Sequence, residues 1–418
     1  MMREAKSSGI AWIGTIPKCW ETDKLKYHLR RNEPRNPGDV VVLSLYRELG
    51  VIPKDSRDDN HNVTSEDTSK YKYVRPGDFV INKMKAWQGS VAVSEYEGIV
   101  SPAYFVYEFT DDTIFKRYFH YLLRSCYKDE FMRLSGGIRV GQWDLPADAL
   151  ENTPILIPPM DEQCRIADFL DTKCAEIDAL TADIQTQIDT LEQYKRSVIT
   201  ETVTKGLNPN AEMKDSGIQW IGDMPAHWNV IRGKYILHYM QKPVREDDGV
   251  ITCFRDGEVT LRSNRREEGF TMSDKEIGYQ GIDVGDLVVH GMDGFAGSIG
   301  ISDSRGKASP VLNVLETGQN KRYIMYYLRS MAYSDVFLAL ATGIRVRSCD
   351  LRWNKLAELS YPVPPLNEQN AIVKHIDSVL SKADAVIADK KAQLATLNEY
   401  KKSLIFEYVT GKKEVPIS

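Results

Sequence analysis

Several features of membrane proteins and metalloproteins are missing from this 418-residue sequence. No stretch reaches the ~18 uninterrupted apolar residues that a membrane-spanning helix needs. The N-terminal MMREAKSSGIAWIG also lacks the long apolar segment of a secretory signal. The 7 histidines and 6 cysteines include no Cys-x-x-Cys pair. We therefore expect no metal site, no disulfide framework, and a reducing, cytoplasmic setting.

The motifs of a self-contained DNA enzyme are missing too. There is no Walker A sequence, and neither Pro158-Pro159-Met160 nor Pro364-Pro365-Leu366 has the flanks of the Asn/Asp-Pro-Pro-aromatic motif of adenine methyltransferases. The glycines between 291 and 300 have the spacing of a phosphate-binding turn, but no clear strand–loop–helix unit surrounds them. We expect a flexible hairpin there, and neither a catalytic residue nor a cofactor of the chain's own.

An excess of basic residues, which would point directly to nucleic acid, is also lacking, because the net charge is -5. Residues 161–205 contain ten acidic and five basic residues, so this segment accounts for the whole net charge. The rest of the chain is neutral on balance, which leaves room for local basic patches. Net charge therefore neither supports nor excludes DNA binding.

The sequence does contain a tandem repeat. Ser8-Gly9-Ile10-Ala11-Trp12-Ile13-Gly14 recurs 208 residues later as Ser216-Gly217-Ile218-Gln219-Trp220-Ile221-Gly222. Gly137-Ile138-Arg139-Val140 recurs as Gly343-Ile344-Arg345-Val346, with the offset now 206. Residues 35–70 share little with 243–280. The halves therefore share one fold but carry different loops, as two readers of two different sequences would.

Each half has the same predicted internal order. Short alternating apolar runs bounded by Gly, Pro and Asn, such as 40–43 and 78–81, predict strands, and 115–134 and 321–340 predict helices. A strand then ends at the paired prolines, and Asp161 or Asn367 is the expected N-cap of a long helix. The long helix of the first half has no Pro or Gly from 160 to 205, which predicts a rod of roughly 65 Å.

Heptad spacing predicts that the two long helices pack on each other rather than only on their own domains. The expected seam in the first helix comprises Ile177, Ile184, Leu191 and Val198, with Leu180, Gln187 and Tyr194. The expected stripe in the second helix comprises Val379, Ala383, Val386, Leu394, Leu397 and Leu404.

Taken together and in order, these motifs resemble the specificity subunit of type I restriction–modification systems. The resemblance rests on the paired Ser-Gly-Ile-x-Trp-Ile-Gly openings, the run at 77–89, the paired Pro-Pro-x-x-Glu-Gln helix starts and the linker 204–209. It implies an α+β fold with two pseudo-repeated α/β target-recognition domains (1–157 and 207–363). Two long antiparallel coiled-coil helices (158–206 and 364–413) would separate these domains.

The resemblance also implies function and partners. Each domain would read one half of a bipartite double-stranded DNA site, and the helices, with neighbouring surface, would dock two methyltransferase subunits. In a restricting complex two motor–nuclease subunits would join these. S-adenosylmethionine, ATP and Mg would belong to those partners. The alternatives are a structural coiled-coil adaptor without DNA contact, or the specificity subunit of a methylation-only or type II-like system.

Candidate DNA-contacting residues are basic, amide and polar side chains in the two domains. In the first domain we expect contacts from Asn82, Lys83, Lys85, Trp87, Gln88, Arg133, Arg139 and Gln142. In the second we expect them from Arg262, Arg265, Arg266, His290, Asp293, Arg345, Arg347 and Arg352.

Some repeated residues have two interpretations. Arg139 and Arg345 could contact phosphate or fasten each domain to its helix. Glu162, Gln163, Glu368 and Gln369 are candidates for partner binding, with helix capping as the alternative. Trp12, Trp20, Trp220 and Trp228 favour core packing over base stacking.

Overall fold

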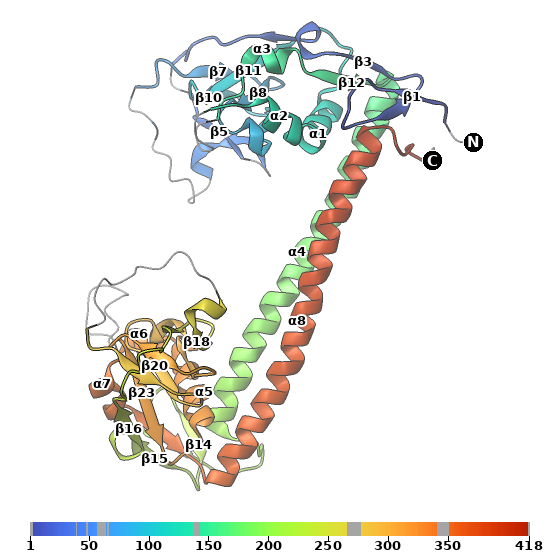
Figure 1. Ribbon diagram of the computed structural model, residues 1–418. Coiled ribbons are helices and arrows are strands. Elements are labelled where there is room, and N and C mark those ends of the chain that lie inside the picture. Colours follow the sequence, from blue (N-terminus) through green and yellow to red (C-terminus); the bar gives the residue numbers. More distant parts are fainter. Residues whose placement is uncertain are drawn as a thin grey trace. The chain divides into compact units, whose positions relative to one another are not determined.

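The computed structural model describes residues 3–38, 40–46, 49–56, 64, 67–137, 143–265, 277–340 and 351–416 (Figure 1). The chain divides into two compact units, one comprising Met1–Ile184 with Ala392–Ser418 and the other Gln185–Lys391. Both unit boundaries fall inside the long helices α4 (Met160–Lys205) and α8 (Leu366–Val409). Each unit is described by itself.

Unit 1 is built around a four-stranded antiparallel sheet with the order β4-β11-β8-β9. Its strands are β4 (Leu29–Arg31), β8 (Phe79–Asn82), β9 (Val91–Val93) and β11 (Tyr104–Phe109). Two-stranded pairs surround it: β1 (Ala5–Ser7) with β2 (Thr15–Pro17), β3 (Glu21–Lys24) with β12 (Pro154–Ile157), β5 (Leu43–Tyr46) with β6 (Gly50–Pro53), and β7 (Lys72–Val74) with β10 (Gly98–Val100). The helices are α1 (Lys116–Cys126), α2 (Lys128–Leu134) and α3 (Ala147–Glu151), with short 3-10 turns at Leu25–Tyr27 (η1), Lys54–Ser56 (η2) and Ala86–Gln88 (η3).

Strand β8 has a core on each of its faces. Side chains alternate across a strand, so Phe79 and Ile81 pack into the cluster that holds α1 and the beginning of α4. Val80 faces the second cluster, under β5 and β6. A strand buried on both faces has an unbroken apolar sequence, which is why Phe-Val-Ile was recognisable as a strand.

Unit 2 repeats this architecture element by element. Its four-stranded sheet has the order β16-β23-β20-β21, and β20 again alternates between two cores, with Leu287 and Val289 on one side and Val288 on the other. The strands are β13 (Met213–Asp215), β14 (Asp223–Pro225), β15 (Asn229–Arg232), β16 (Leu237–Met240), β17 (Ile251–Cys253), β18 (Val259–Leu261), β19 (Gln280–Ile282), β20 (Leu287–His290), β21 (Ile299–Ile301), β22 (Gly306–Ala308), β23 (Leu312–Thr317) and β24 (Ser360–Val363). The helices are α5 (Lys321–Tyr333), α6 (Val336–Ala339) and α7 (Trp353–Glu358), with 3-10 turns at Gly233–Tyr235 (η5), Arg262–Asn264 (η6) and Gly294–Ala296 (η7).

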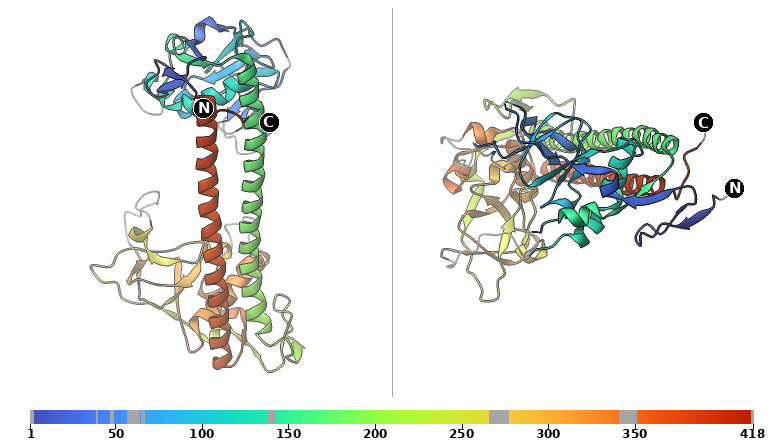
Figure 2. Two further views of the ribbon diagram at one scale, coloured as in Figure 1. Left: turned by 90° about the vertical axis from the view of Figure 1, so that its right-hand side faces the viewer. Right: turned by 90° about the horizontal axis from the view of Figure 1, so that it is seen from above.

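Helices α4 and α8 run antiparallel and lie side by side (Figure 2). In unit 2, Lys195 Nζ lies 2.6 Å from Asp384 Oδ1, and Lys390 donates to Gln187 Oε1. In unit 1, Lys401 Nζ lies 2.6 Å from Asp178 Oδ1. Lower numbers in α4 pair with higher numbers in α8, as antiparallel packing requires.

The predicted seam was right in one of its two positions. Ile177 and Ile184 are buried, and Leu191 and Val198 are half-buried. At the second predicted position Gln187 is half-buried and accepts from Lys390, but Leu180 is 47% exposed and Tyr194 is 52% exposed. The second seam position is occupied by Cys174, Thr181, Ile188 and Lys195 instead. Thr181 and Lys195 interrupt the apolar pattern at these positions. The neighbouring Leu180 and Tyr194 are less polar, so the sequence favoured them as the second seam position. In α8, Val386 is likewise exposed and Ile387 is buried in its place.

Two local predictions are corrected at the ends of elements. Helix α4 begins at Met160, and the carbonyl of Pro159 accepts from the amides of Glu162 and Gln163, so Pro159 and not Asp161 is the N-cap. The equivalent Pro365 precedes α8, which corrects Asn367. The first apolar run forms strand only from Leu43 onward, not from Val40.

The repeated tryptophans confirm the core-packing interpretation at one pair of sites. Trp20 and Trp228 are completely buried. Trp220 is half-buried and donates through Nε1 to Tyr327 Oη at 3.1 Å. Trp12 is 36% exposed and packs edge-on against Tyr127.

Candidate nucleic-acid interface

The same strand-to-turn junction occurs in both units, where β8 and β20 end. Asn82 Oδ1 accepts from the amide of Met84 at 3.1 Å, and His290 Nδ1 accepts from the amide of Asp293 at 2.9 Å. The turn ends in both copies at a glycine with left-handed backbone, Gly89 (φ 86°) or Gly297 (φ 97°), a conformation that disfavours any side chain. Asn82 and His290 thus both accept a hydrogen bond from the backbone of the following turn, one through a side-chain amide oxygen and the other through an imidazole nitrogen.

In unit 1 this turn forms one wall of a cavity of about 440 Å³. Four of the predicted DNA-contacting residues line it: Asn82, Lys85, Trp87 and Gln88. The charged residues among its described lining are Lys54 and Lys85, and Tyr46, Tyr71 and Tyr104 supply aromatic rings. This cavity, called cavity 1, therefore combines positive charge, an amide pair and aromatic surface, a mixture suited to nucleic acid.

In unit 2 the equivalent elements form a cavity of about 620 Å³, called cavity 2. Three predicted residues line it: His290, Asp293 and Arg265. Arg255 lies 3.2 Å from Asp293, and Arg265 lies 2.5 Å from Asp256 and over the Phe254 ring. Burial lowers the pKa of His290, so its Nδ1 serves as an acceptor near neutral pH. The described lining of cavity 2 therefore combines two arginines, two aspartates and a histidine, where that of cavity 1 has two lysines and two side-chain amides.

Lys83 and Arg133 of the first domain lie outside cavity 1. Lys83 Nζ is 3.0 Å from Asp144 Oδ2, and Arg133 is 2.6 Å from Glu130, whose side chain is buried. Because each cation already has a carboxylate partner, a phosphate would have to compete for it. Their contact with DNA stays a prediction.

The remaining predicted residues of unit 2 are scattered. Arg262 donates to Thr252 Oγ1 at 3.4 Å, and Arg352 is an exposed residue at the beginning of α7. The predictions for Arg139, Gln142, Arg266, Arg345 and Arg347 fall outside the described residues.

The paired Glu-Gln residues hold each long helix to its domain. Gln163 Oε1 accepts from the amide of Phe115 at 2.8 Å, and its Nε2 donates to the carbonyls of Thr113 and Pro158 at 2.8 and 2.9 Å. Glu162 accepts from Trp20 Nε1 at 2.9 Å and pairs with Arg3. In unit 2, Gln369 accepts from the amide of Asn320 and donates to Pro364, and Glu368 lies 2.8 Å from His227.

These contacts give the two glutamines a role that neither interpretation predicted. Gln163 is 1% exposed and Gln369 is 0% exposed, so neither presents surface to a partner. Besides the carbonyl of the proline that precedes each helix, their side chains bond groups of the domain between 113 and 115 and at 319 and 320, so helix capping alone does not describe them. Gln163 and Gln369 are therefore tertiary anchors, and the partner contact of Glu162 and Glu368 stays a prediction, with the Glu368 side chain 24% exposed beside His227.

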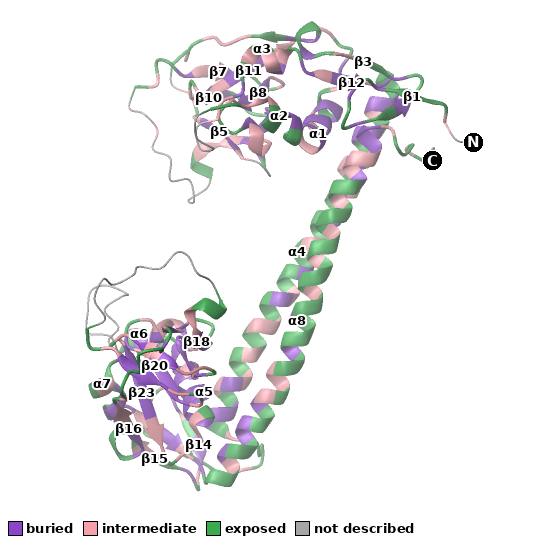
Figure 3. Ribbon diagram, viewed as in Figure 1, coloured by how far each residue is buried: buried purple, intermediate pink, exposed green. Residues whose placement is uncertain are grey.

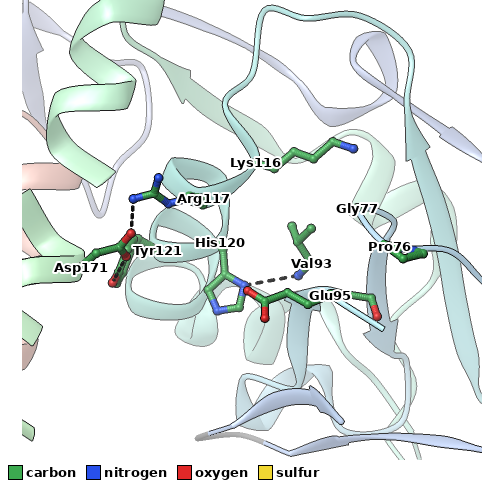
Figure 4. Close-up of a pocket in the computed structure, with 10 residues that line it drawn as sticks. Pro76, Gly77, Val93, Glu95, Lys116, Arg117, His120, Tyr121 and Asp171 are labelled. Atoms are coloured by element: carbon green, nitrogen blue, oxygen red, sulfur yellow. Dashed lines mark hydrogen bonds and ion pairs between the residues drawn. The ribbon is translucent and has the colours of Figure 1, made fainter. Parts of the chain in front are cut away.

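A second pair of anchors was missed by the sequence reasoning. Arg117 and Tyr121 on α1 both point to Asp171 on α4, beside a cavity of about 470 Å³ (Figure 4). In unit 2, Arg322 and Tyr326 on α5 both contact Asp377 on α8 at 2.6 Å. The signal was present as Arg-x-x-x-Tyr in both copies, with an aspartate at nearly the same offset.

The described part of the chain offers little for other chemistry. It contains no cluster of three or more His, Cys, Asp or Glu side chains placed to hold a metal ion. Burial raises the pKa of the Cys126 and Cys253 thiols to about 12, which makes both unreactive near neutral pH. Among the helices described, none is both long and apolar enough to cross a membrane.

Comparison with known sequences points to one family. Residues 28–190 match the family model described as the type I restriction modification DNA specificity domain. The type I restriction enzyme MjaVIII specificity subunit of Methanocaldococcus jannaschii is 24% identical, with 96% of this chain and 94% of that protein covered. The EcoBI specificity subunit of Escherichia coli is 21% identical, with 81% and 74% covered.

Solved structures show the same fold. A chain from a structure described as the basis of complex assembly and conformational transition of the type I R-M system has a TM-score of 0.68 and 15% identity, over 95% of this chain and 99% of that one. The HsdS subunit from Thermoanaerobacter tengcongensis has a TM-score of 0.51 and 15% identity, over 95% and 98%.

Proposed function

Because the chain belongs to the specificity subunits of type I restriction–modification systems, we propose that it reads a bipartite double-stranded DNA target, one half with each unit. Cavities 1 and 2 and the turns that border them are the proposed base-reading surfaces. The observation that carries this proposal is that two equivalent sites on one repeated scaffold have different linings. A structural adaptor would have no use for that difference.

The linings suggest what each site prefers. One Asn or Gln side chain can make two hydrogen bonds to the edge of adenine, and Lys can donate to the edge of guanine. The Asn82, Lys85 and Gln88 side chains of unit 1 therefore favour a purine edge. The Asp293 carboxylate of unit 2 accepts from an exocyclic amine, as on cytosine or adenine. Each good side-chain-to-base pair is worth about 1–3 kcal/mol of discrimination.

The proposed division of labour leaves chemistry to partner subunits. Two methyltransferase subunits would bring S-adenosylmethionine and modify adenine, and two motor–nuclease subunits would use ATP and Mg to cleave unmodified DNA. A methylation-only system is the alternative, and it would use this chain in the same way. In either case this chain supplies recognition and is not itself an enzyme.

The test is to co-express the chain with its methyltransferase in a methylation-free host and to map modified adenines. A two-part motif with a fixed gap is expected. Lys85→Ala with Gln88→Ala should relax one half of the motif, and Asp293→Ala the other half. Relaxation of both halves by either change, or modification without any motif, would contradict the assignment of one half to each unit.

A further inference from the structure

One apolar residue occupies the same place in the turns that follow β8 and β20, called the recognition turns (83–89 and 291–297). Both strands are buried along almost their whole length (Figure 3). Residues 83–88 are Lys-Met-Lys-Ala-Trp-Gln, and the equivalent residues 291–296 are Gly-Met-Asp-Gly-Phe-Ala. Methionine is the one residue that these six positions share. Met84 and Met292 are therefore the same where the rest of the turn differs.

Both methionines lie outside the packed interior of their unit. Met84 is 44% exposed and Met292 is 46% exposed. Neither belongs to a hydrophobic cluster of the described residues. A single exposed apolar side chain is ordinary on a protein surface, but the same one at the same place in both units is not explained by packing within the chain.

The backbone beneath each methionine is fixed by equivalent hydrogen bonds. The residue before it, Lys83 or Gly291, donates from its amide to the loop that leads into β11 or β23, at 3.1 or 2.7 Å. The carbonyl of the same residue accepts from the chain just before α3 or α7, at 3.0 or 2.8 Å. Asn82 and His290 accept from the amide of the methionine itself, at 3.1 and 3.2 Å. A backbone fixed in this way holds a projecting side chain in a defined place.

The methionines lie beside the proposed base-reading side chains. Met84 lines cavity 1. Met292 lies in the chain between His290 and Asp293, which both line cavity 2. DNA that is read by either unit would therefore meet a methionine, whichever bases it carries there.

We propose that Met84 and Met292 are wedges that enter the base stack of the half-site read by their own unit and loosen the adenine that the methyltransferase modifies. The inference rests on the proposed function, in which an adenine of each half-site is methylated. Methyltransferases take their target base out of the duplex, and the lost stacking has to be offset. Two half-sites of different sequence share this step, so both units require the same residue for it.

Methionine has the physical properties of a wedge. Its side chain is apolar, unbranched and polarisable, and it adapts to irregular surfaces. Proteins insert apolar side chains such as Met, Leu, Ile and Phe between base steps, which partially unstacks the bases and bends the duplex. Contact with the methyl group of thymine is the other use of an apolar side chain on DNA, but it would require thymine at the same place in two different half-sites.

The test uses the full chain in complex with its methyltransferase, bound to DNA that carries the mapped motif. 2-Aminopurine replaces the target adenine of one half-site at a time, because its fluorescence rises when it leaves the base stack. Met84→Ala should lower this fluorescence in the half-site of unit 1 and slow methylation of that adenine by about 10-fold or more. Met292→Ala should do the same in the half-site of unit 2. The motif should stay unchanged, because a wedge reads no base.

Matched controls separate the position of a methionine from its loss. Met160→Ala in unit 1 and Met213→Ala in unit 2 remove methionines that are each 39% exposed but lie on α4 and β13, and both should leave fluorescence and rate unchanged. Met84→Leu and Met292→Leu should keep most of both, since leucine is apolar and of similar volume. Methylation of the other half-site shows in each variant that the chain is folded and assembled.

A second substrate distinguishes a wedge from a base contact. A mismatch opposite the target adenine weakens the stack in advance, so it should restore most of the methylation that Met84→Ala loses. Unchanged fluorescence and rate in both alanine variants would overturn the inference and leave the proposed function standing. It would also be overturned if the motif relaxed at one thymine and uracil there reproduced the loss with the wild-type chain. A wild-type complex that methylates no two-part motif would contradict the proposed function itself.

Discussion

Replacing Gln163 by alanine tests whether the Glu-Gln motif is an anchor within the chain. The side chain is 1% exposed and makes three hydrogen bonds, to the amide of Phe115 and the carbonyls of Thr113 and Pro158. Gln163→Ala would leave those three backbone groups without these partners. At about 1 kcal/mol for each lost bond, the free energy of unfolding of unit 1 should fall by about 2–4 kcal/mol.

The assay must report on one unit at a time, because a chain with two compact units need not unfold in a single step. Hydrogen exchange followed by mass spectrometry does this, with peptides of α1 reporting on unit 1 and peptides of α5 on unit 2. A loss of about 3 kcal/mol corresponds to roughly 150-fold faster exchange for amides that open by unit-wide unfolding. Gln369→Ala should produce the same effect in α5 and spare α1.

Glu176→Ala is the matched control, since this exposed residue lies on the same helix and in the same unit and pairs with Lys173 at 2.7 Å. Its removal should cost no more than about 0.5 kcal/mol. An effect of Gln163→Ala as small as that of the control would refute the anchoring role. A stable Gln163→Ala variant that had lost only methyltransferase binding would restore the partner-binding interpretation.

Three further outcomes are expected. Inserting seven residues into both long helices preserves the heptad and lengthens each helix by about 10 Å. The gap of the methylated motif should widen by about three base pairs, and both half-sites should stay unchanged. An unchanged gap in an active complex would count against helix length as the spacer. Burial lowers the pKa of His120 to about 4, below its ordinary value of 6.5. Unit 1 should therefore lose stability as the pH falls from about 6.5 to 4. His120→Gln should remove this pH dependence of the stability, as measured by thermal unfolding across that range. Asp377→Asn weakens its contacts with Arg322 and Tyr326 and should destabilise unit 2 by about 1–3 kcal/mol without changing the motif that is read, as measured by exchange in α5 and by methylation mapping.

The sequence by itself determined the repeat, the order of elements and the extent of the long helices. These features are recorded in spacing along the chain. A strand buried on both faces needs a run such as Phe79-Val80-Ile81, and a helix of 46 residues needs a stretch without Pro or Gly. One seam position was also readable, because Ile177 and Ile184 are apolar and seven residues apart.

The tertiary structure alone decided which charged and polar side chains remain available. Lys83 is paired with Asp144 and Gln163 with Thr113, partners 61 and 50 residues distant in the chain, and no local pattern records such pairings. The second seam position was hidden for a related reason. Lys195 is tolerated there because most of its side chain is buried while its ammonium group reaches Asp384 on α8, 2.6 Å away. Composition and periodicity describe what one segment can do, whereas the use of a side chain depends on which other segment the fold brings beside it.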